Sequence, residues 1–111
     1  MPNNELTAPE YVARVLALYL RLPQTPSRTH RTDRQLATHW YTQALAWEVI
    51  EGALLLAVAR RCLRDPALPP LQPIRSLHYF VPVLDEVQAT PLAPDYVQYL
   101  RSKLAPFLPQ V

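Results

Sequence analysis

Thirteen prolines stand beside a single glycine in this chain of 111 residues. The tight turns of β-hairpins need positive φ angles, which glycine and asparagine adopt most readily, so a hairpin-rich sheet is disfavoured. Most of the prolines lie between apolar segments, where they end helices because proline lacks the backbone N–H that a helix interior needs. The sequence therefore predicts an all-α protein whose helices are separated by proline-rich linkers.

One compact domain over residues 1–111 is expected, because half of the residues are apolar and a chain of this length can bury a real core. Apolar side chains at spacings of three and four predict a bundle of four or five helices. The first helix is expected over residues 8–22, where Thr7 and Glu10 have the spacing of a capping box.

The second helix is predicted to begin at Thr32, with Gln35 as its capping-box partner. From there the segment 33–64 has two readings, one long helix or two. A break within residues 43–46 would give a helix-turn-helix arrangement, whereas the absence of glycine and proline there favours one helix. The run ALLLAVA, residues 53–59, is apolar on every side of a helix and predicts the central helix of the domain.

The remaining helices are expected after the linker ALPPLQP. Pro82 falls inside a helical pattern that Ser76 could cap, so this helix either begins late or is kinked. A last helix is expected from Pro94 until Pro106, since proline suits the first turn of a helix and not its interior. The side chains expected to pack inward or along this helix are Tyr96, Tyr99, Leu100, Lys103 and Leu104.

Several functional classes are excluded by what the sequence lacks. A single cysteine, Cys62, rules out an internal disulfide and agrees with a cytoplasmic location. The apolar run of residues 53–59 is far shorter than the roughly 20 residues of a membrane-spanning helix, and the N-terminus has no signal-peptide pattern. Three scattered histidines form no zinc motif, and one glycine allows no phosphate-binding loop, so no metal or cofactor is expected.

Eight arginines are the candidate nucleic-acid-binding residues. The first four lie in a stretch whose only acid is Asp33, and the others follow the central helix: Arg21, Arg28, Arg31, Arg34, Arg60, Arg61, Arg64 and Arg75. Arginine forms paired hydrogen bonds with phosphate oxygens and releases counterions from a polyanion. The alternatives are a solvated loop for the first group and compensation of a helix dipole for the second. The sequence does not determine whether the two groups of arginines share one face of the protein.

No catalytic set of nucleophile, base and orienting group can be nominated, so no enzyme activity is predicted. Cys62 lies among apolar residues and is expected to be a small buried hydrophobe. Four aromatic side chains could stack on bases or anchor a partner, although core packing is the commoner use: Trp40, Trp47, Tyr79 and Phe80.

The segment PIRSLHYFVPVLDEV, Pro73 to Val87, resembles closing segments of plasmid and phage replication-initiator proteins and of small uncharacterised proteins of mobile elements. Those initiators carry winged-helix DNA-binding regions, and this chain has no pattern for a wing hairpin. The resemblance therefore implies an accessory helical module beside DNA or a replication or transposition protein. It transfers no site residues.

Together these observations predict a non-enzymatic, nucleic-acid-associated accessory protein of a bacterial mobile element or replication system, with DNA or RNA as its partner. The alternative is a helical protein-interaction or homo-oligomerisation module that binds a protein partner, or forms a homodimer, without nucleic acid. Abundant apolar residues in a small chain support that alternative, because one small core can leave part of them exposed.

Overall fold

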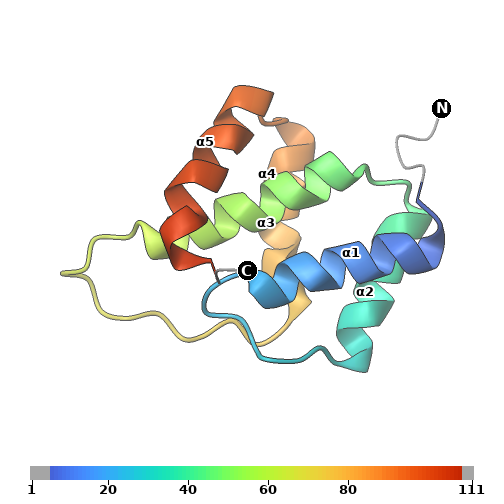
Figure 1. The fold of residues 1–111 in the computed structure, drawn as a ribbon, viewed down its shortest axis with the longest axis horizontal. Coiled ribbons are helices and arrows are strands. Elements are labelled where there is room, and N and C mark those ends of the chain that lie inside the picture. Colours follow the sequence, from blue (N-terminus) through green and yellow to red (C-terminus); the bar gives the residue numbers. More distant parts are fainter. Residues whose placement is uncertain (1–5, 109–111) are drawn as a thin grey trace.

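The computed structural model describes residues 6–108, and every regular element within them is helical (Figure 1). The five α-helices and two short 3₁₀ helices are α1 (Ala8–Arg21), α2 (Arg31–Thr42), α3 (Trp47–Cys62), η1 (Leu77–Phe80), α4 (Val81–Ala89), α5 (Pro94–Leu104) and η2 (Ala105–Phe107). The all-α class predicted from the proline and glycine content is confirmed.

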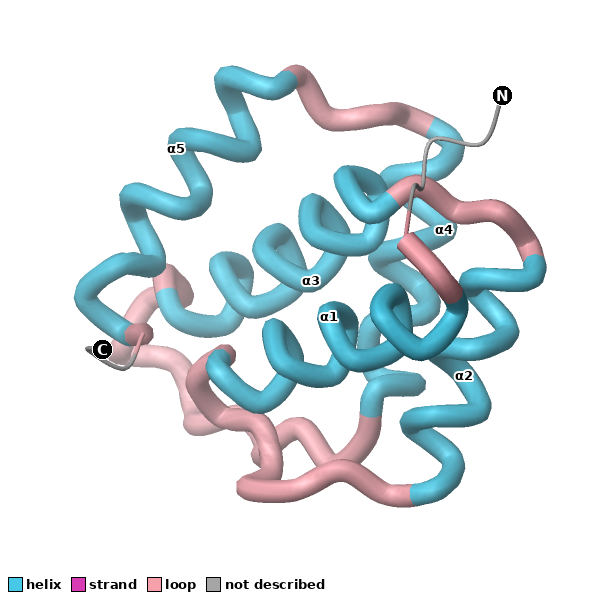
Figure 2. The backbone as a smooth tube through the Cα atoms, turned by 45° about the vertical axis from the view of Figure 1, so that its right-hand side comes forward, coloured by secondary structure: helices cyan, strands magenta, loops and turns pink. Residues whose placement is uncertain are grey.

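Helix α3 is the centre of the fold, as the apolar run predicts. Residues 52–59 are all buried, and α3 packs against α1, α4 and α5 as well as η1. Figure 2 shows α1 and α3 side by side with α5 on the other flank of α3, and in Figure 1 α4 passes behind α3. Helix α2 packs mainly on α1. No helix within residues 6–108 is both long and apolar enough to cross a bilayer.

The predicted start of α1 is confirmed. The Thr7 hydroxyl accepts a hydrogen bond from the Glu10 backbone N–H at 3.3 Å, and the Glu10 carboxylate accepts one from the Thr7 N–H at 2.9 Å. These two bonds satisfy N–H groups that have no partner inside the helix. The helix then buries a stripe of Tyr11, Val15 and Tyr19 against the core.

The predicted start of α2 is wrong. The helix begins at Arg31, so His30 is the N-cap and Thr32 is already helical. The acceptor at this end is Asp33, whose Oδ2 accepts from the His30 backbone N–H at 2.9 Å. Asp33 is fully buried, and a buried carboxylate needs donors, which the free N–H groups around a helix start supply.

Two helices, not one, occupy residues 33–64. Helix α2 ends in a Schellman motif, in which the Ala44 N–H donates to the Tyr41 carbonyl at 2.9 Å and the Leu45 N–H donates to the Trp40 carbonyl at 3.2 Å. Ala44 takes a left-handed conformation with φ of 58°. The lack of glycine therefore does not prevent the break between α2 and α3. Ala44 adopts the left-handed conformation at a steric cost that glycine would not have.

Replacing Ala44 with glycine is expected to raise the free energy of unfolding by about 0.8 kcal/mol, the midpoint of a range of about 0–1.6 kcal/mol. Glycine avoids the strain of the left-handed conformation, which stabilises the folded state by about 1–2 kcal/mol. It also increases the conformational entropy of the unfolded chain, which lowers the stability by about 0.4–1 kcal/mol. Urea denaturation followed by circular dichroism measures the change. Gln24 is the matched control, since it also has a positive φ, of 67°, but its side chain accepts a hydrogen bond from Arg61, so Gln24→Gly is expected to destabilise. An Ala44→Gly variant less stable than the parent would contradict this account of the turn.

The last third of the chain resolves the ambiguity at Pro82. The α-helix begins late, at Val81, so that Pro82 lies in its first turn where its missing N–H costs nothing. The preceding residues form η1, and Ser76 precedes it without a side-chain cap. In α5, Leu100 and Leu104 are buried as predicted, whereas Tyr96 and Tyr99 are 42% and 49% exposed and do not pack into the core. The two rings stack on each other instead, with centroids 5.8 Å apart.

Candidate nucleic-acid interface

Two connections that lie far apart in the sequence meet at one end of the molecule. The first, residues 22–30, joins α1 to α2, and the second, residues 63–76, joins α3 to η1. Both run along the same edge of the fold in Figures 1 and 2. The Ile74 backbone N–H donates to the Gln24 carbonyl at 3.0 Å, which ties the two connections together.

Arg61 holds both connections from the end of α3. Its side chain is only 8% exposed, and Nε donates to the Gln24 side-chain oxygen at 2.8 Å. Nη1 donates to the Tyr79 hydroxyl at 3.1 Å, and Nη2 donates to the Gln72 carbonyl. One guanidinium thereby joins α3, the first connection and the end of the second connection. Its buried charge is surrounded by oxygen acceptors, which is what makes its burial tolerable.

Asp33 holds the second connection from the start of α2. Its Oδ1 accepts a hydrogen bond from the Leu77 backbone N–H at 2.9 Å, while Oδ2 binds the His30 N–H. Leu77 is the first residue of η1 and lies 44 residues from Asp33, so this one carboxylate accepts N–H groups at the starts of two helices. The sequence provided no signal for this contact, because the residue that needs the acceptor is remote.

These ties bring Arg75 to the start of α2. Arg75 lies between Ile74 and Leu77, which are the two residues bonded to the segment 24–33. It thus joins Arg28, Arg31 and Arg34 at one end of the molecule. We call these four exposed side chains the arginine surface.

The arginine surface has no carboxylate partner among the described residues. The only acid between residues 11 and 47 is Asp33, which is buried and occupied by two backbone N–H groups, whereas the same stretch holds five arginines. From residue 48 to the C-terminus, six basic and six acidic residues balance. The net positive charge therefore comes from residues 11–47, which form most of α1, all of α2 and the connection between them.

Arg31 and Arg34 lie where an arginine does least for helix stability. They occupy the first turn of α2, where the helix dipole is positive, and they line one shallow hollow with Gln35 and Thr38. Dipole compensation explains arginines at the end of α3 and cannot explain these two. A bound anion at this end would meet both the guanidinium groups and the dipole.

The second group of predicted arginines is engaged within the protein. Arg60 forms two hydrogen bonds to the Glu86 carboxylate, at 2.9 and 3.0 Å, and Arg64 donates to the Pro69 carbonyl at 3.1 Å. Arg61 is buried as described above. Of the first group, Arg21 is exposed at the end of α1. The eight predicted residues therefore do not form one free face: the structure joins Arg75 to the first group and holds Arg60, Arg61 and Arg64 in intramolecular contacts.

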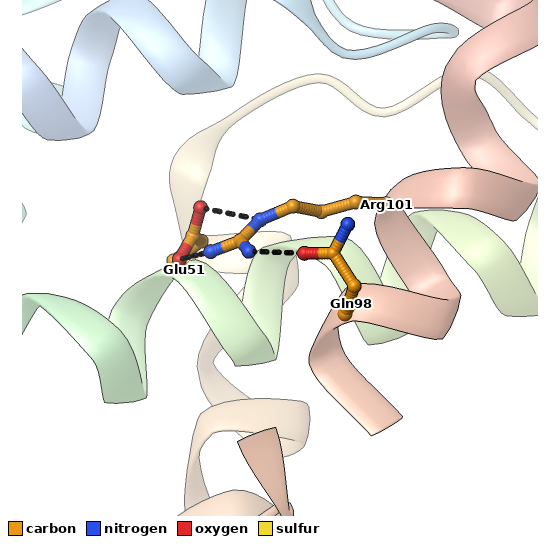
Figure 3. A network of polar contacts seen from close by, with 3 residues as sticks. All are labelled: Glu51, Gln98 and Arg101. Carbon is orange, nitrogen blue, oxygen red and sulfur yellow. Dashed lines mark hydrogen bonds and ion pairs between the residues drawn. The ribbon is translucent and has the colours of Figure 1, made fainter. Parts of the chain in front are cut away.

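Arg101 on α5 shows the same kind of engagement (Figure 3). Its Nη2 and Nε lie 2.7 and 3.3 Å from the two carboxylate oxygens of Glu51, and Nη1 donates to the Gln98 side-chain oxygen at 2.9 Å. This pair links α5 to the central helix.

The aromatic candidates divide between core and surface. Trp40 and Phe80 are buried, and Trp47 lies under the Arg14 guanidinium at 4.6 Å from the ring centroid. Tyr79 is 40% exposed and lines one surface hollow together with Arg75, a member of the arginine surface. It is the aromatic side chain of the four that is available to a ligand at this end of the molecule.

The remaining candidates are the Cys62 thiol, as a nucleophile, and the histidines, as metal ligands. Cys62 is only partly buried, so its predicted full burial is wrong. This partial burial still raises the pKa of the Cys62 thiol above its ordinary value, against the opposing influence of the Arg61 charge. A raised pKa lowers the fraction of thiolate, which is the nucleophilic form. Within residues 6–108 no three histidine, cysteine or acidic side chains are grouped to hold a metal ion.

Comparison with known proteins gave no relative: no family model, no curated protein and no solved structure matches this chain.

Proposed function

We propose that this protein is a non-enzymatic accessory protein that binds the phosphate backbone of DNA or RNA through the arginine surface. The observation that carries the proposal is the gathering of Arg28, Arg31, Arg34 and Arg75 at one end of the fold, exposed and without a carboxylate partner in the described part of the chain. Guanidinium groups left unpaired at the start of a helix are suited to phosphate oxygens.

The proposed contacts are made to the backbone of the nucleic acid and not to base edges in a groove. In helix-turn-helix proteins the helix after the turn enters the major groove, and it must therefore be exposed. Here the helix after the α2–α3 turn is the central one, whose residues 52–59 are buried. Backbone contacts give affinity that depends strongly on salt and little on sequence.

The segment that resembles replication-initiator proteins contributes to the same surface. Pro73 to Val87 covers the end of the second connection, η1 and most of α4, and it supplies both Arg75 and Tyr79. The proposal therefore keeps the accessory role beside the replication or transposition machinery of a mobile element.

Replacing Arg28 and Arg31 together with alanine is expected to weaken binding to unrelated DNA and RNA sequences alike. Each lost phosphate contact makes the plot of log affinity against log salt shallower by about 0.9 for duplex DNA and about 0.7 for single strands, so the double variant is expected to lose nearly two units on duplex DNA. Titration of labelled DNA and RNA at several salt concentrations measures this slope. Arg31 is the first residue of α2, where alanine is a good helix former, so no loss of helix is expected.

The matched control is the double variant Arg60→Ala/Arg101→Ala. It removes the same charge from two arginines that are already paired, Arg60 with the exposed Glu86 and Arg101 with the largely covered Glu51. The exposed pair adds about 0–1 kcal/mol to stability, and circular dichroism establishes that the helices of the control are intact. The control is expected to keep most of the salt slope. Equal loss in both variants would show that net charge acts without a defined surface, and no binding at low salt would refute the proposal.

The alternative function, a protein-interaction or homo-oligomerisation module, rests on a different observation. Tyr96, Tyr99 and Phe107 expose aromatic surface on α5 and η2, and the Lys103 ammonium lies 5.8 Å from the Tyr99 ring centroid. Exposed aromatic residues of this kind are enriched at protein interfaces. This alternative predicts no salt-dependent binding of nucleic acid, so the same titrations separate the two functions.

A further inference from the structure

A hollow of about 500 Å³ opens beside the arginine surface, at the end of the second connection. Leu71 and Pro73 provide apolar wall, Tyr79 provides an aromatic ring, and Arg75 provides a free positive charge. The hollow is open to solvent over much of its extent, so it suits one face of a flat ring and not an enclosed small ligand.

The Tyr79 ring is held in place from two sides. The Arg61 guanidinium carbon lies 5.3 Å from the ring centroid, and the Phe80 ring packs edge-on with centroids 5.4 Å apart. The Arg61 Nη1 also donates a hydrogen bond to the Tyr79 hydroxyl oxygen at 3.1 Å, which restrains the ring further. A ring that is fixed and still 40% exposed loses little conformational entropy when a ligand stacks on it.

We infer that this hollow takes a base of a single-stranded nucleic acid, which stacks on Tyr79 while Arg75 binds an adjacent phosphate. The inference rests on the proposed phosphate binding by the arginine surface and names the form of nucleic acid that this surface selects. A planar ring joined to a phosphate matches an aromatic wall next to a guanidinium group. In a duplex the bases are stacked inside and cannot reach Tyr79, so the preference for single strands follows.

The test compares three polyanions at one salt concentration: a single-stranded oligothymidylate, a duplex of equal length, and heparin, which has no bases. The parent protein is expected to bind the single strand more tightly than the duplex. Tyr79→Leu is expected to weaken single-strand binding about 5- to 140-fold, the equivalent of about 1–3 kcal/mol for one stacked base. Its affinity for duplex and heparin is expected to stay the same, and Tyr79→Phe, which keeps the ring, is expected to retain single-strand binding.

Tyr99→Leu is the matched control, since Tyr99 is a similarly exposed tyrosine beside a cation on α5. It is expected to change none of the three affinities. A second readout is the fluorescence of 2-aminopurine in the oligonucleotide, which stacking on Tyr79 quenches in the parent and Tyr79→Phe and not in Tyr79→Leu. Circular dichroism of each variant establishes that the helices are intact.

The outcomes separate this inference from the proposed function. If the parent binds neither heparin nor any nucleic acid, phosphate binding by the arginine surface is refuted, and the base site with it. If heparin and duplex bind but Tyr79→Leu leaves the single-strand affinity unchanged, only the base site is refuted. A loss that is equal for all three polyanions would also refute it, because the tyrosine would then act on the arginines and not on a base.

Discussion

Replacing Asp33 with alanine is expected to lower the free energy of unfolding by about 2–4 kcal/mol. The side chain is fully buried, and its two oxygens accept hydrogen bonds from His30 and Leu77, both at 2.9 Å. Hydrogen bonds to a charged acceptor contribute about 1.5–3 kcal/mol each, and a buried N–H left without an acceptor costs about 1–3 kcal/mol. Release of the desolvated carboxylate offsets part of this loss.

Urea denaturation measures the change, with Asp85→Ala as the control because Asp85 is an exposed acid on α4. Hydrogen exchange of the Leu77 amide provides a local readout, since this N–H is expected to lose protection in Asp33→Ala and to keep it in the control. Asp33→Asn retains one acceptor oxygen and is expected to fall between the two. An Asp33→Ala variant within about 0.5 kcal/mol of the parent would contradict the double-capping role.

Asp33→Ala is also expected to change the geometry of the arginine surface. Because Asp33 holds Leu77 against the start of α2, it also sets where Arg75 lies relative to Arg31. Loss of this tie is expected to loosen the arginine surface while leaving all four of its members in the sequence.

Raising the pH from about 9 to 12 is expected to destabilise the protein by several kcal/mol through Tyr11 and Tyr19. Burial raises the pKa of Tyr11 from 10.0 to about 12. Burial, and next the negative charge of Asp33, raise the pKa of Tyr19 to about 12. Both phenols are fully buried. The folded state therefore favours the neutral phenols, and this stability is fully present below pH 10 and is lost as the pH rises to about 12. Two pKa units correspond to about 2–3 kcal/mol for each tyrosine.

Denaturation at a series of alkaline pH values, together with tyrosinate absorbance, measures this loss. Tyr19→Phe is expected to remove about half of the pH dependence, and it sacrifices no hydrogen bond, because the buried Tyr19 hydroxyl has no partner within residues 6–108. Tyr11→Phe removes a similar share but also the bond from the Tyr11 hydroxyl to the Leu45 carbonyl, 2.9 Å long, which adds about 1 kcal/mol of loss at neutral pH. A stability curve that stays flat from pH 9 to 12 would contradict the raised pKa values.

Local patterns in the sequence determined the all-α fold class and the positions of most of the helices. One glycine among thirteen prolines excluded hairpins, Thr7 and Glu10 began α1, and the all-apolar run 53–59 identified the central helix. These features act over at most a few turns of chain, so they can be read without knowing what packs where.

Only the tertiary structure decided which arginines are bonded within the protein, which are exposed, and where α2 begins. Arg61 and Arg75 look alike in sequence, yet one is buried among Gln24, Gln72 and Tyr79 and the other is exposed. The difference comes from hydrogen bonds between residues 11 to 44 positions apart, which local patterns do not encode. The physical reason is burial: a carboxylate or guanidinium that packing removes from water must find partners wherever the fold brings them, and those partners then determine which charges remain free.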